Sequence, residues 1–378
     1  MNVSAMRASF AKAAATGDEA PLYFYSHLFL THPEVRDMFP VSMATQRDRF
    51  FTALGDVVAR VDDLDALVPT LQQLGRDHRK FGTVAEHYPA AGASLLATLE
   101  HFDDEWNDEL AEQWTEAYKL VADVMIQAAG EDAGPPWWEA DVVDHERRTF
   151  DIAVLHLRPR EPLDFRAGQS VSVETELRPR LWRFYSPANA PRPDGTIELH
   201  VQAREGGPVS TALVQRTGVG DQVRLGPPLG HIALDAESDR DLLLVAGGTG
   251  LAPMKALIDE VARHGPERRV DLFVGARAED RLYERPELER LEKEHGWLSV
   301  TLAVSEDDQS ALEHGDIGDV VQRHGPWRSR DVYVAGPEAM VDDTRSRLLQ
   351  SGVRAERVRT EAFAPSRQGP DLNGKVTE

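Results

Sequence analysis

The first third of the chain carries the spacing of amphipathic helices. Apolar residues recur three and four positions apart from Ala5 to about Gln127, and long alternating β-branched runs are missing there. That period gathers apolar side chains on one face of each helix. The pattern ends at residues 130–136, where glycine and proline stop helices. We therefore predict an all-α domain at residues 1–132, followed by a linker at residues 133–136.

Two further patterns follow the linker. Between about residues 139 and 234, short β-type runs alternate with proline and glycine, which predicts an antiparallel β-barrel at residues 137–236. From Asp241 onwards, apolar strands alternate with helices. We expect these strands at residues 242–246, 270–274, 298–304 and 332–335. Repeated β–α units imply a parallel sheet, so an α/β domain is predicted at residues 237–366, with a flexible tail at residues 367–378.

The composition narrows the class of protein. A chain of 378 residues is longer than one core comfortably supports, in keeping with several domains. Cysteine is absent, which fits a reducing cytoplasm and excludes cysteine-ligated iron–sulfur clusters. The net charge of −22 argues against binding to nucleic acid or to anionic lipid. Since the chain also lacks an apolar run of about 18 residues, we expect a cytoplasmic protein without stable membrane association. Its oligomeric state does not follow from the sequence.

Two phrases in the barrel region have residue types that suit a binding site. Arg183, Tyr185 and Ser186 stand at i, i+2 and i+3, so that Arg183 and Tyr185 share a strand face. A guanidinium, an aromatic ring and a hydroxyl suit a ligand with a flat ring and a charged tail. The second phrase, Gly206–Thr211, opens a helix whose first N–H groups are available to an anion. The alternatives are an ordinary edge strand and a plain helix cap.

Two glycine loops at the ends of predicted strands indicate a dinucleotide site. Gly247–Pro253 and Ala335–Met340 each follow such a strand, and a helix is expected from near Met254. The first loop departs from the G-x-G-x-x-G fingerprint because Pro253 takes the place of the last glycine, yet it still allows close backbone approach. Ligands of open α/β sheets bind where strands end, so both loops are expected to face one crevice.

Together these motifs resemble the ferredoxin-NADP reductase superfamily over residues 138–365. The resemblance implies a set of residues that contact FAD: Arg183, Tyr185, Ser186, Gly207, Val209 and Ser210. It implies a second set that receives NADH or NADPH: Gly248, Thr249, Gly250, Gly336 and Pro337. It also places Phe363 beside the flavin ring. Ala335 departs from the family, which often has cysteine there, so any thiol contribution to hydride transfer is lost.

The choice between NADH and NADPH stays open on the sequence. Arg277 and Arg281 follow the strand at residues 270–274, where a 2′-phosphate would bind, and this favours NADPH. Glu279 and Asp280 stand beside them and weaken that inference. Family resemblance leans slightly to NADH.

Three predicted helices of the first domain each carry one polar residue on an apolar face. His78 continues an apolar stripe, Gln46 opens the stripe that ends at Val61, and Tyr25 shares a face with Leu22. A lone histidine in such a place is more often a core residue than a metal ligand. Three such residues together suit haem, because imidazole ligates iron while a phenol and an amide donate hydrogen bonds to bound dioxygen.

The predicted helical domain resembles a globin, and nearly the whole chain resembles the flavohaemoglobin family. The resemblance implies that His78 is the proximal ligand of the iron of haem b. It makes Tyr25 and Gln46 the distal pair, and it packs Phe39 on the porphyrin. Tyr88 matches a tyrosine of the hydrogen-bond network around the proximal histidine.

The globin part also departs from its family in two places. Phe50 stands where the family normally has leucine over the iron, which is expected to narrow the distal pocket. The glutamate that partners the proximal tyrosine falls on Ala129, and Glu131 lies two residues away, on a different helix face. We therefore expect a weaker proximal network, a less imidazolate-like His78 and less push for O–O cleavage.

The two halves together imply an NAD(P)H-dependent oxidoreductase with nitric oxide dioxygenase activity. NAD(P)H reduces FAD by hydride transfer, FAD passes single electrons to the haem, and nitric oxide combines with the bound oxygen to give nitrate. The expected ligands are nitric oxide, O2 and NAD(P)H. Two alternatives stay open: a flavin reductase that serves another acceptor, and a gas-binding or redox-sensing globin.

Overall fold

The fold is known from a computed structural model that describes residues 2–230, 232–264, 268–364 and 376–377. The chain divides into two compact units, Met1–Trp137 and Trp138–Glu378. The first unit is helical, and the second contains an antiparallel barrel followed by a parallel-sheet α/β part, which confirms the predicted fold class. No helix in the described part of the chain is long and apolar enough to cross a membrane.

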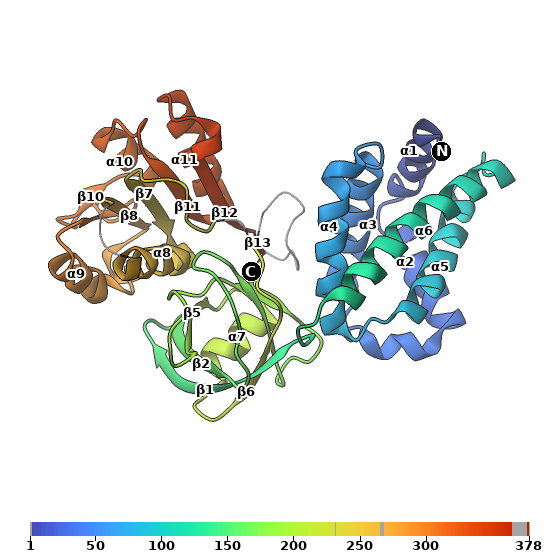
Figure 1. Ribbon diagram of the computed structural model, residues 1–378, viewed down its shortest axis with the longest axis horizontal. Coiled ribbons are helices and arrows are strands. Elements are labelled where there is room, and N and C mark those ends of the chain that lie inside the picture. The colour runs from blue at the N-terminus through green and yellow to red at the C-terminus, as the bar shows by residue number, and fades with distance from the viewer. Residues whose placement is uncertain (1, 231, 265–267, 365–375, 378) are drawn as a thin grey trace. The chain divides into compact units, whose positions relative to one another are not determined.

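The helical unit, blue to green in Figure 1, is built from six helices joined by short turns. Its α-helices are α1 (Val3–Ala14), α2 (Glu19–Thr31), α3 (Ala44–Ala59), α4 (Leu64–His78), α5 (Tyr88–Phe102) and α6 (Asp108–Glu131). Its 3-10 turns are η1 (Pro33–Met38), η2 (Arg79–Phe81) and η3 (Ala85–His87). At the crossing of α4 and α6, a Cβ atom on Gly75 would lie 2.2 Å from the backbone oxygen of Met125. Glycine therefore allows the close approach that holds the end of α4, and with it His78, against α6.

The buried helix faces differ in part from the predicted stripes. Leu22 is 50% exposed, whereas Phe24, Tyr25 and Leu28 are buried. Leu22 stands two residues from Phe24, which is about 200° around the helix, and so faces away from the core. The prediction that Val61 belongs to the helix of Gln46 is wrong, because α3 ends at Ala59.

The barrel of the second unit is made of short strands and one helix. They are β1 (Trp138–Arg147), β2 (Ile152–Pro159), β3 (Val171–Thr175), β4 (Arg183–Tyr185), β5 (Ile197–Gln202), α7 (Pro208–Gln215) and β6 (Gln222–Leu225). The strand order is β4-β3-β6-β1-β2-β5, and a bridge between Pro187 and Leu199 links its two edges, so the ring is nearly closed. Val209 and Leu213 of α7 pack into the barrel core.

The α/β part follows the predicted alternation of strands and helices. Its strands are β7 (Leu242–Gly247), β8 (Val270–Ala276), β9 (Leu298–Val304), β10 (Glu313–His314), β11 (Asp331–Pro337), β12 (Val358–Ala364) and β13 (Val376–Thr377). Its helices are α8 (Leu251–His264), α9 (Arg285–Glu294), α10 (Ile317–His324) and α11 (Glu338–Gln350), with 3-10 turns η4 (Gly248–Gly250), η5 (Glu279–Arg281) and η6 (Ala355–Arg357). The parallel strand order is β10-β9-β8-β7-β11-β12-β13. Most of the tail predicted to be flexible, residues 367–375 and 378, lies outside the described residues.

Helices cover both faces of this parallel sheet. Leu242 and Leu244 of β7 pack in one core with α8 and α9, whereas Leu243 and Val245 pack in another with α10 and α11. Side chains that alternate between two apolar cores are typical of a central strand (Figure 1). Helix α8 begins at Leu251 rather than near Met254, because a proline such as Pro253 is tolerated in a first helical turn.

Candidate functional site

An aromatic cluster surrounds Tyr25 in the helical unit. The Tyr25 ring is buried and lies 5.8 Å from the ring of Phe50 and 5.6 Å from that of Phe39. Phe50 stacks on Phe24 at 4.1 Å. Arg36 fixes the segment of Phe39, because its guanidinium donates to the backbone oxygen of Phe39 at 3.1 Å. The structure thus brings three predicted site residues together in surroundings that strengthen hydrogen bonds by excluding water.

Gln46 lies in the first turn of α3 and is half-buried. It precedes Phe50 by four residues, and residues at this spacing share a helix face. Since Phe50 is in ring contact with Tyr25, the face that carries Gln46 is the one that α3 turns toward the aromatic cluster. The pairing of Gln46 with Tyr25 as distal donors stays a prediction.

His78 is the last residue of α4, and its ring has a fixed orientation. Nδ1 lies 2.8 Å from the backbone oxygen of Leu74, one turn earlier. A carbonyl oxygen only accepts, so Nδ1 carries the proton and Nε2 keeps its lone pair. Burial lowers the pKa of His78, which favours the neutral ring. A neutral imidazole with this tautomer is the form that ligates a metal ion through Nε2.

Tyr88 and Glu131, the two residues considered for the proximal network, lie in different surroundings. Tyr88 packs in the apolar cluster between α4 and α6, where burial raises the pKa of its hydroxyl. Its backbone oxygen accepts a hydrogen bond from the Tyr118 hydroxyl at 2.6 Å. Glu131 is exposed, and its carboxylate accepts a hydrogen bond from Gln127 at 2.7 Å. Glu131 is therefore engaged at the surface, and the weaker proximal network expected from Ala129 stays a prediction.

Charged neighbours on both sides of His78 were not predicted from the sequence. Asp77 and Lys80 form a buried ion pair of 2.6 Å. Arg79 pairs with Asp132 at 2.7 Å and so ties the end of α4 to the segment that follows α6. Consecutive charged residues usually lie in water. The one sign in the sequence that these residues could form buried ion pairs was their position around a histidine on an apolar stripe.

Arg183 and Tyr185 lie on one face of β4 and are both buried. Strand β3 pairs Val173 with Arg183 and Val171 with Tyr185. Arg183 donates to the backbone oxygen of Trp182 at 2.9 Å, and no carboxylate among the described residues pairs with its guanidinium. Burial lowers the pKa of Arg183. A buried guanidinium without a carboxylate partner fits an anionic ligand such as a dinucleotide pyrophosphate.

Ser186 forms a buried contact that the sequence did not reveal. Its hydroxyl donates to Glu361 Oε1 on β12 at 2.7 Å. Phe363 stands two residues after Glu361 and therefore shares its strand face. The hydrogen bond thus brings the face of β12 that carries Phe363 to the end of β4. In the sequence, Glu361 could have been noticed as the acidic residue two positions before Phe363, the aromatic residue predicted to lie beside the flavin.

The glycine phrase of the barrel forms a tight entry to α7. Gly206 has a φ of 73°, and a Cβ atom on Gly207 would lie 2.6 Å from the Ser210 hydroxyl. That hydroxyl accepts a hydrogen bond from the backbone N–H of Arg204 at 3.2 Å, so it stabilises the loop as a cap would. Val209 is fully buried, which leaves only its backbone to face a ligand. The first-turn N–H groups of α7 are therefore the candidate anion donors.

The two glycine loops of the α/β part meet at the carboxyl ends of β7 and β11. A Cβ atom on Gly250 would lie 2.2 Å from the backbone oxygen of Ala335. A Cβ atom on Gly336, whose φ is 148°, would lie 2.9 Å from the backbone oxygen of Gly247. Contacts this short exclude any side chain, so the predicted pair of loops lies backbone to backbone.

The remaining loop residues differ in exposure. Thr249 is buried, whereas Pro337 is exposed and pairs in register with Phe363. Gly248 has a φ of 55°, and a Cβ atom on it would meet nothing within 4 Å. Open space at Gly248 leaves its backbone accessible to a dinucleotide.

The two candidate phosphate-binding arginines have separate environments. Arg281 pairs with Asp151 of the barrel at 2.7 Å and lies over the Phe150 ring. Arg277 has a side chain that is 82% exposed and lies 3.5 Å from Glu306. The structure thus leaves Arg277 as the accessible cation of the two, with a carboxylate beside it.

Comparison with known proteins follows the same division of the chain. Family models match as Globin over residues 22–125, Oxidoreductase FAD-binding domain over residues 139–234 and Oxidoreductase NAD-binding domain over residues 244–346. The flavohemoprotein of Bacillus subtilis is 27% identical over 370 residues, which cover 90% of this chain and 91% of that protein.

Two solved structures share the fold. The flavohemoglobin from Malassezia yamatoensis, solved with bound FAD and heme, has a TM-score of 0.76 at 19% identity, with 94% of this chain and 98% of that chain covered. The FAD/NAD-binding domain of nitric oxide dioxygenase from Vibrio cholerae has a TM-score of 0.54 at 23% identity, with 60% of this chain and 98% of that chain covered.

Fold, site and matches define an NAD(P)H-dependent oxidoreductase in which a globin domain is joined to an FAD-binding and an NAD-binding domain. The three matched segments are consecutive, and the curated relative aligns along nearly its whole length. The chain therefore combines a globin, an FAD-binding and an NAD-binding domain, and it is similar to a flavohemoprotein along nearly its whole length.

Proposed function

We propose that the chain is a nitric oxide dioxygenase that draws its electrons from NAD(P)H. The observation that carries the proposal is an oriented, neutral His78 in a globin domain that is covalently joined to its own reductase. The similarity in fold of the second unit to the reductase domain of a nitric oxide dioxygenase adds support. A gas-binding site and an electron supply in one chain suit repeated turnover more than reversible storage.

The residues fit the three cofactors that this function requires. When bound, haem supplies an iron that holds oxygen, FAD converts a hydride into single electrons, and NAD(P)H supplies the hydride. His78 would hold the iron through Nε2, because Nδ1 is engaged by the backbone oxygen of Leu74. Arg183, buried without a described carboxylate partner, would bind the FAD pyrophosphate.

The distal side would direct the chemistry of the gas ligands. The Tyr25 phenol would donate a hydrogen bond to the polarised oxygen ligand, with Gln46 as a second donor. Phe39 and Phe50 pack around the Tyr25 ring and keep water away from it. An apolar wall of this kind suits nitric oxide, which is small and uncharged, and it keeps reactive species from escaping into water.

Turnover of nitric oxide is the direct test. We expect the full chain, loaded with haem and FAD, to consume nitric oxide in the presence of O2 and NADH and to release nitrate in equal amount. Electrode traces and a nitrate assay measure both. NADH oxidation without nitric oxide consumption would contradict the proposal and favour a reductase for another acceptor. Reversible gas binding without turnover would favour a sensor.

Substitution of Tyr25 by phenylalanine tests the distal donor. The variant keeps the ring contacts with Phe39 and Phe50 and removes only the hydroxyl. Loss of a hydrogen bond worth roughly 1.5 kcal/mol is expected to speed oxygen dissociation from the ferrous protein about tenfold. Stopped-flow replacement of oxygen by carbon monoxide measures this rate. Tyr23→Phe is the matched control, since the Tyr23 ring on the same helix stacks on His101. An oxygen dissociation rate in Tyr25→Phe that equals that of Tyr23→Phe and of the unchanged chain would show that Tyr25 is not the distal hydrogen-bond donor.

A further inference from the structure

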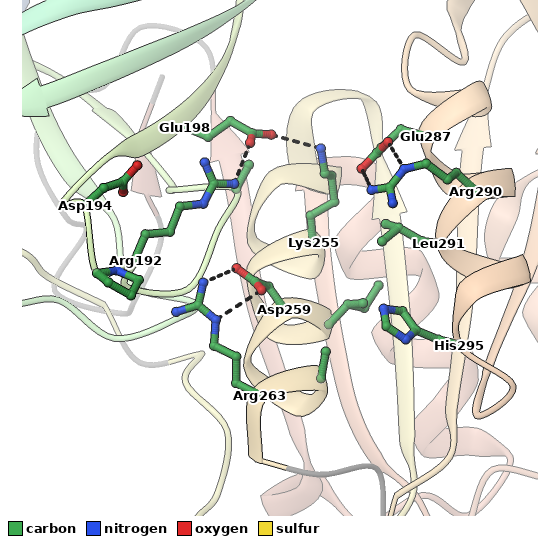
Figure 2. Close-up of a pocket in the computed structure, with 14 residues that line it drawn as sticks. Arg192, Asp194, Glu198, Lys255, Asp259, Arg263, Glu287, Arg290, Leu291 and His295 are labelled. Carbon is green, nitrogen blue, oxygen red and sulfur yellow. Dashed lines mark hydrogen bonds and ion pairs between the residues drawn. The ribbon is translucent and has the colours of Figure 1, made fainter.

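A buried charge network joins the barrel to the α/β part of the second unit. Its centre is Lys255 on α8, whose side chain is 9% exposed. Lys255 Nζ lies 2.9 Å from Glu198 Oε1 on β5 of the barrel and 2.7 Å from Glu284 Oε2, directly before α9. Figure 2 shows Lys255 extending from α8 toward Glu198. One ammonium group thus connects a carboxylate of the barrel with a carboxylate of the α/β part.

Two further polar contacts cross the same joint. His200 of β5 contacts Glu198 through Nε2 at 3.0 Å and the Tyr283 hydroxyl through Nδ1 at 2.8 Å. Arg148, in the turn after β1, donates to Glu284 Oε1 at 2.8 Å. Barrel residues therefore meet the segment Tyr283–Glu284 at two points besides Lys255. These side chains form one connected network rather than separate surface ion pairs.

The network holds a cation of its own. Glu198, His200 and Glu284 place ligand atoms within 4.8 Å of one another, as a metal site would. Lys255 already contacts both carboxylates. Burial alone would lower the pKa of Lys255, but the charges of Glu198 and Glu284 outweigh it and leave the pKa above its ordinary value. The ammonium group therefore lies between the two carboxylates, and Arg148 and Arg192 add positive charge at Glu284 and Glu198.

Both ends of this network lead to residues of the cofactor sites. Lys255 lies one helical turn after Leu251, where α8 begins directly after the loop Gly248–Gly250. On the barrel side, the backbone oxygen of Glu198 accepts a hydrogen bond from the N–H of Ala188 at 2.8 Å. Ala188 stands two residues after Ser186 of the candidate flavin strand. The series of contacts that links one candidate cofactor site to the other is therefore short, and it passes through Lys255.

A cavity of about 390 Å³ lies beside the Glu198–Lys255 contact (Figure 2). Both side chains line it, together with Asp259 and Leu291. Close apolar packing is therefore interrupted at this part of the joint. On the side of the cavity, the Glu198–Lys255 ion pair therefore spans the joint without close packing behind it.

We propose that Lys255 is a positioning residue for hydride transfer, because it fixes the dinucleotide-binding turn of α8 relative to the strand that carries the flavin site. The inference rests on the reductase half of the chain and not on nitric oxide turnover. Hydride transfer requires the reacting atoms in near-contact geometry, and a misplacement of about 1 Å can cost about 100-fold in rate. Lys255 touches neither reacting atom and acts through the distance between the two sites.

Anaerobic reduction of the flavin by NADH tests the proposal on the full chain loaded with FAD and haem. We expect Lys255→Met to lower the limiting rate constant of flavin reduction roughly 10- to 100-fold, as a misplacement approaching about 1 Å would. The apparent dissociation constant for NADH should change far less, since the loop itself is intact. Glu198→Gln removes the barrel-side charge, which Arg192 and His200 also contact, and should slow the same step. Both substitutions remove the Lys255–Glu198 contact, so the rate loss of the double variant should be smaller than the product of the two single losses.

Arg290→Met is the matched control. Arg290 lines the same cavity, but its ion pairs join it to Glu287 and Glu294 on its own helix α9. It should leave the flavin reduction rate at the wild-type value. A wild-type rate in Lys255→Met, or a normal rate in Glu198→Gln beside a slow Lys255→Met, would overturn the proposal. If Lys255→Met does not retain FAD, Glu198→Gln alone decides the outcome. Flavin reduction needs no nitric oxide, so its result is independent of the proposed dioxygenase activity.

Discussion

Replacing His78 with alanine is expected to remove the haem Soret band from the purified chain while leaving the flavin spectrum in place. The imidazole of His78 is the candidate iron ligand, with Nδ1 held by the backbone oxygen of Leu74. Loss of a mere outer-sphere partner lowers metal affinity about 10- to 100-fold, so loss of the ligand itself should lower haem content at least tenfold. Absorbance spectra of equal protein amounts, before and after addition of hemin, measure the effect.

Two comparisons separate ligation from general damage. Imidazole added to His78→Ala should restore part of the Soret band, because it supplies the missing nitrogen ligand to the cavity left by the side chain. His32→Ala serves as the control, since His32 ends α2 and pairs with the exposed Glu34. An unchanged Soret band in His78→Ala would make His78 a structural core residue, which was the alternative open on the sequence.

Replacing Gly250 with alanine is expected to stop flavin reduction by NAD(P)H almost completely. The added methyl group would lie 2.2 Å from the backbone oxygen of Ala335 and 2.7 Å from the backbone nitrogen of Gly336. Backbone atoms cannot turn aside as a flexible side chain does, so the loops Gly247–Pro253 and Ala335–Met340 must separate. A displacement near 1 Å corresponds to a loss of about 100-fold in rate. Stopped-flow bleaching of the flavin by NADH and by NADPH measures this.

Gly296→Ala is the control for the Gly250 variant. A Cβ atom on Gly296 would meet nothing within 4 Å, so the same chemical change should have no effect on flavin reduction. Chemical reduction by dithionite should remain normal in both variants, because FAD is held by the barrel. A wild-type rate of flavin reduction by NADH in Gly250→Ala would contradict the proposal that these two loops form the dinucleotide site.

Local sequence patterns predicted most of the architecture. The change from three- and four-residue spacing to short β-runs and then to β–α alternation placed the three kinds of fold in the right order. Loops such as Gly247–Pro253 were recognisable because the small residues that allow a close backbone approach are neighbours in the sequence. The face of α2 was less secure, since Leu22 and Tyr25 both fit an apolar stripe and only packing against other helices decides between them.

Contacts between distant segments could not be predicted in the same way. Ser186 and Glu361 are 175 residues apart, and Lys255 and Glu198 are 57 residues apart. A charged residue in a sequence looks like a surface residue until the topology shows that another element covers it. Arg281 illustrates this, because its pairing with Asp151 depends on the barrel turn after β1.

Gly75 shows how a requirement for function can fall on a residue without any functional group. Its missing side chain lets α4 approach the backbone of Met125. Glycine inside a helix lowers stability by roughly 0.5–1 kcal/mol relative to alanine, so helix propensity alone would favour its replacement. Among natural variants of this chain, position 75 should therefore be nearly as invariant as the histidine three residues later. Conservation at position 75 would then be explained by the close packing of two helix backbones and not by the chemistry of a side chain.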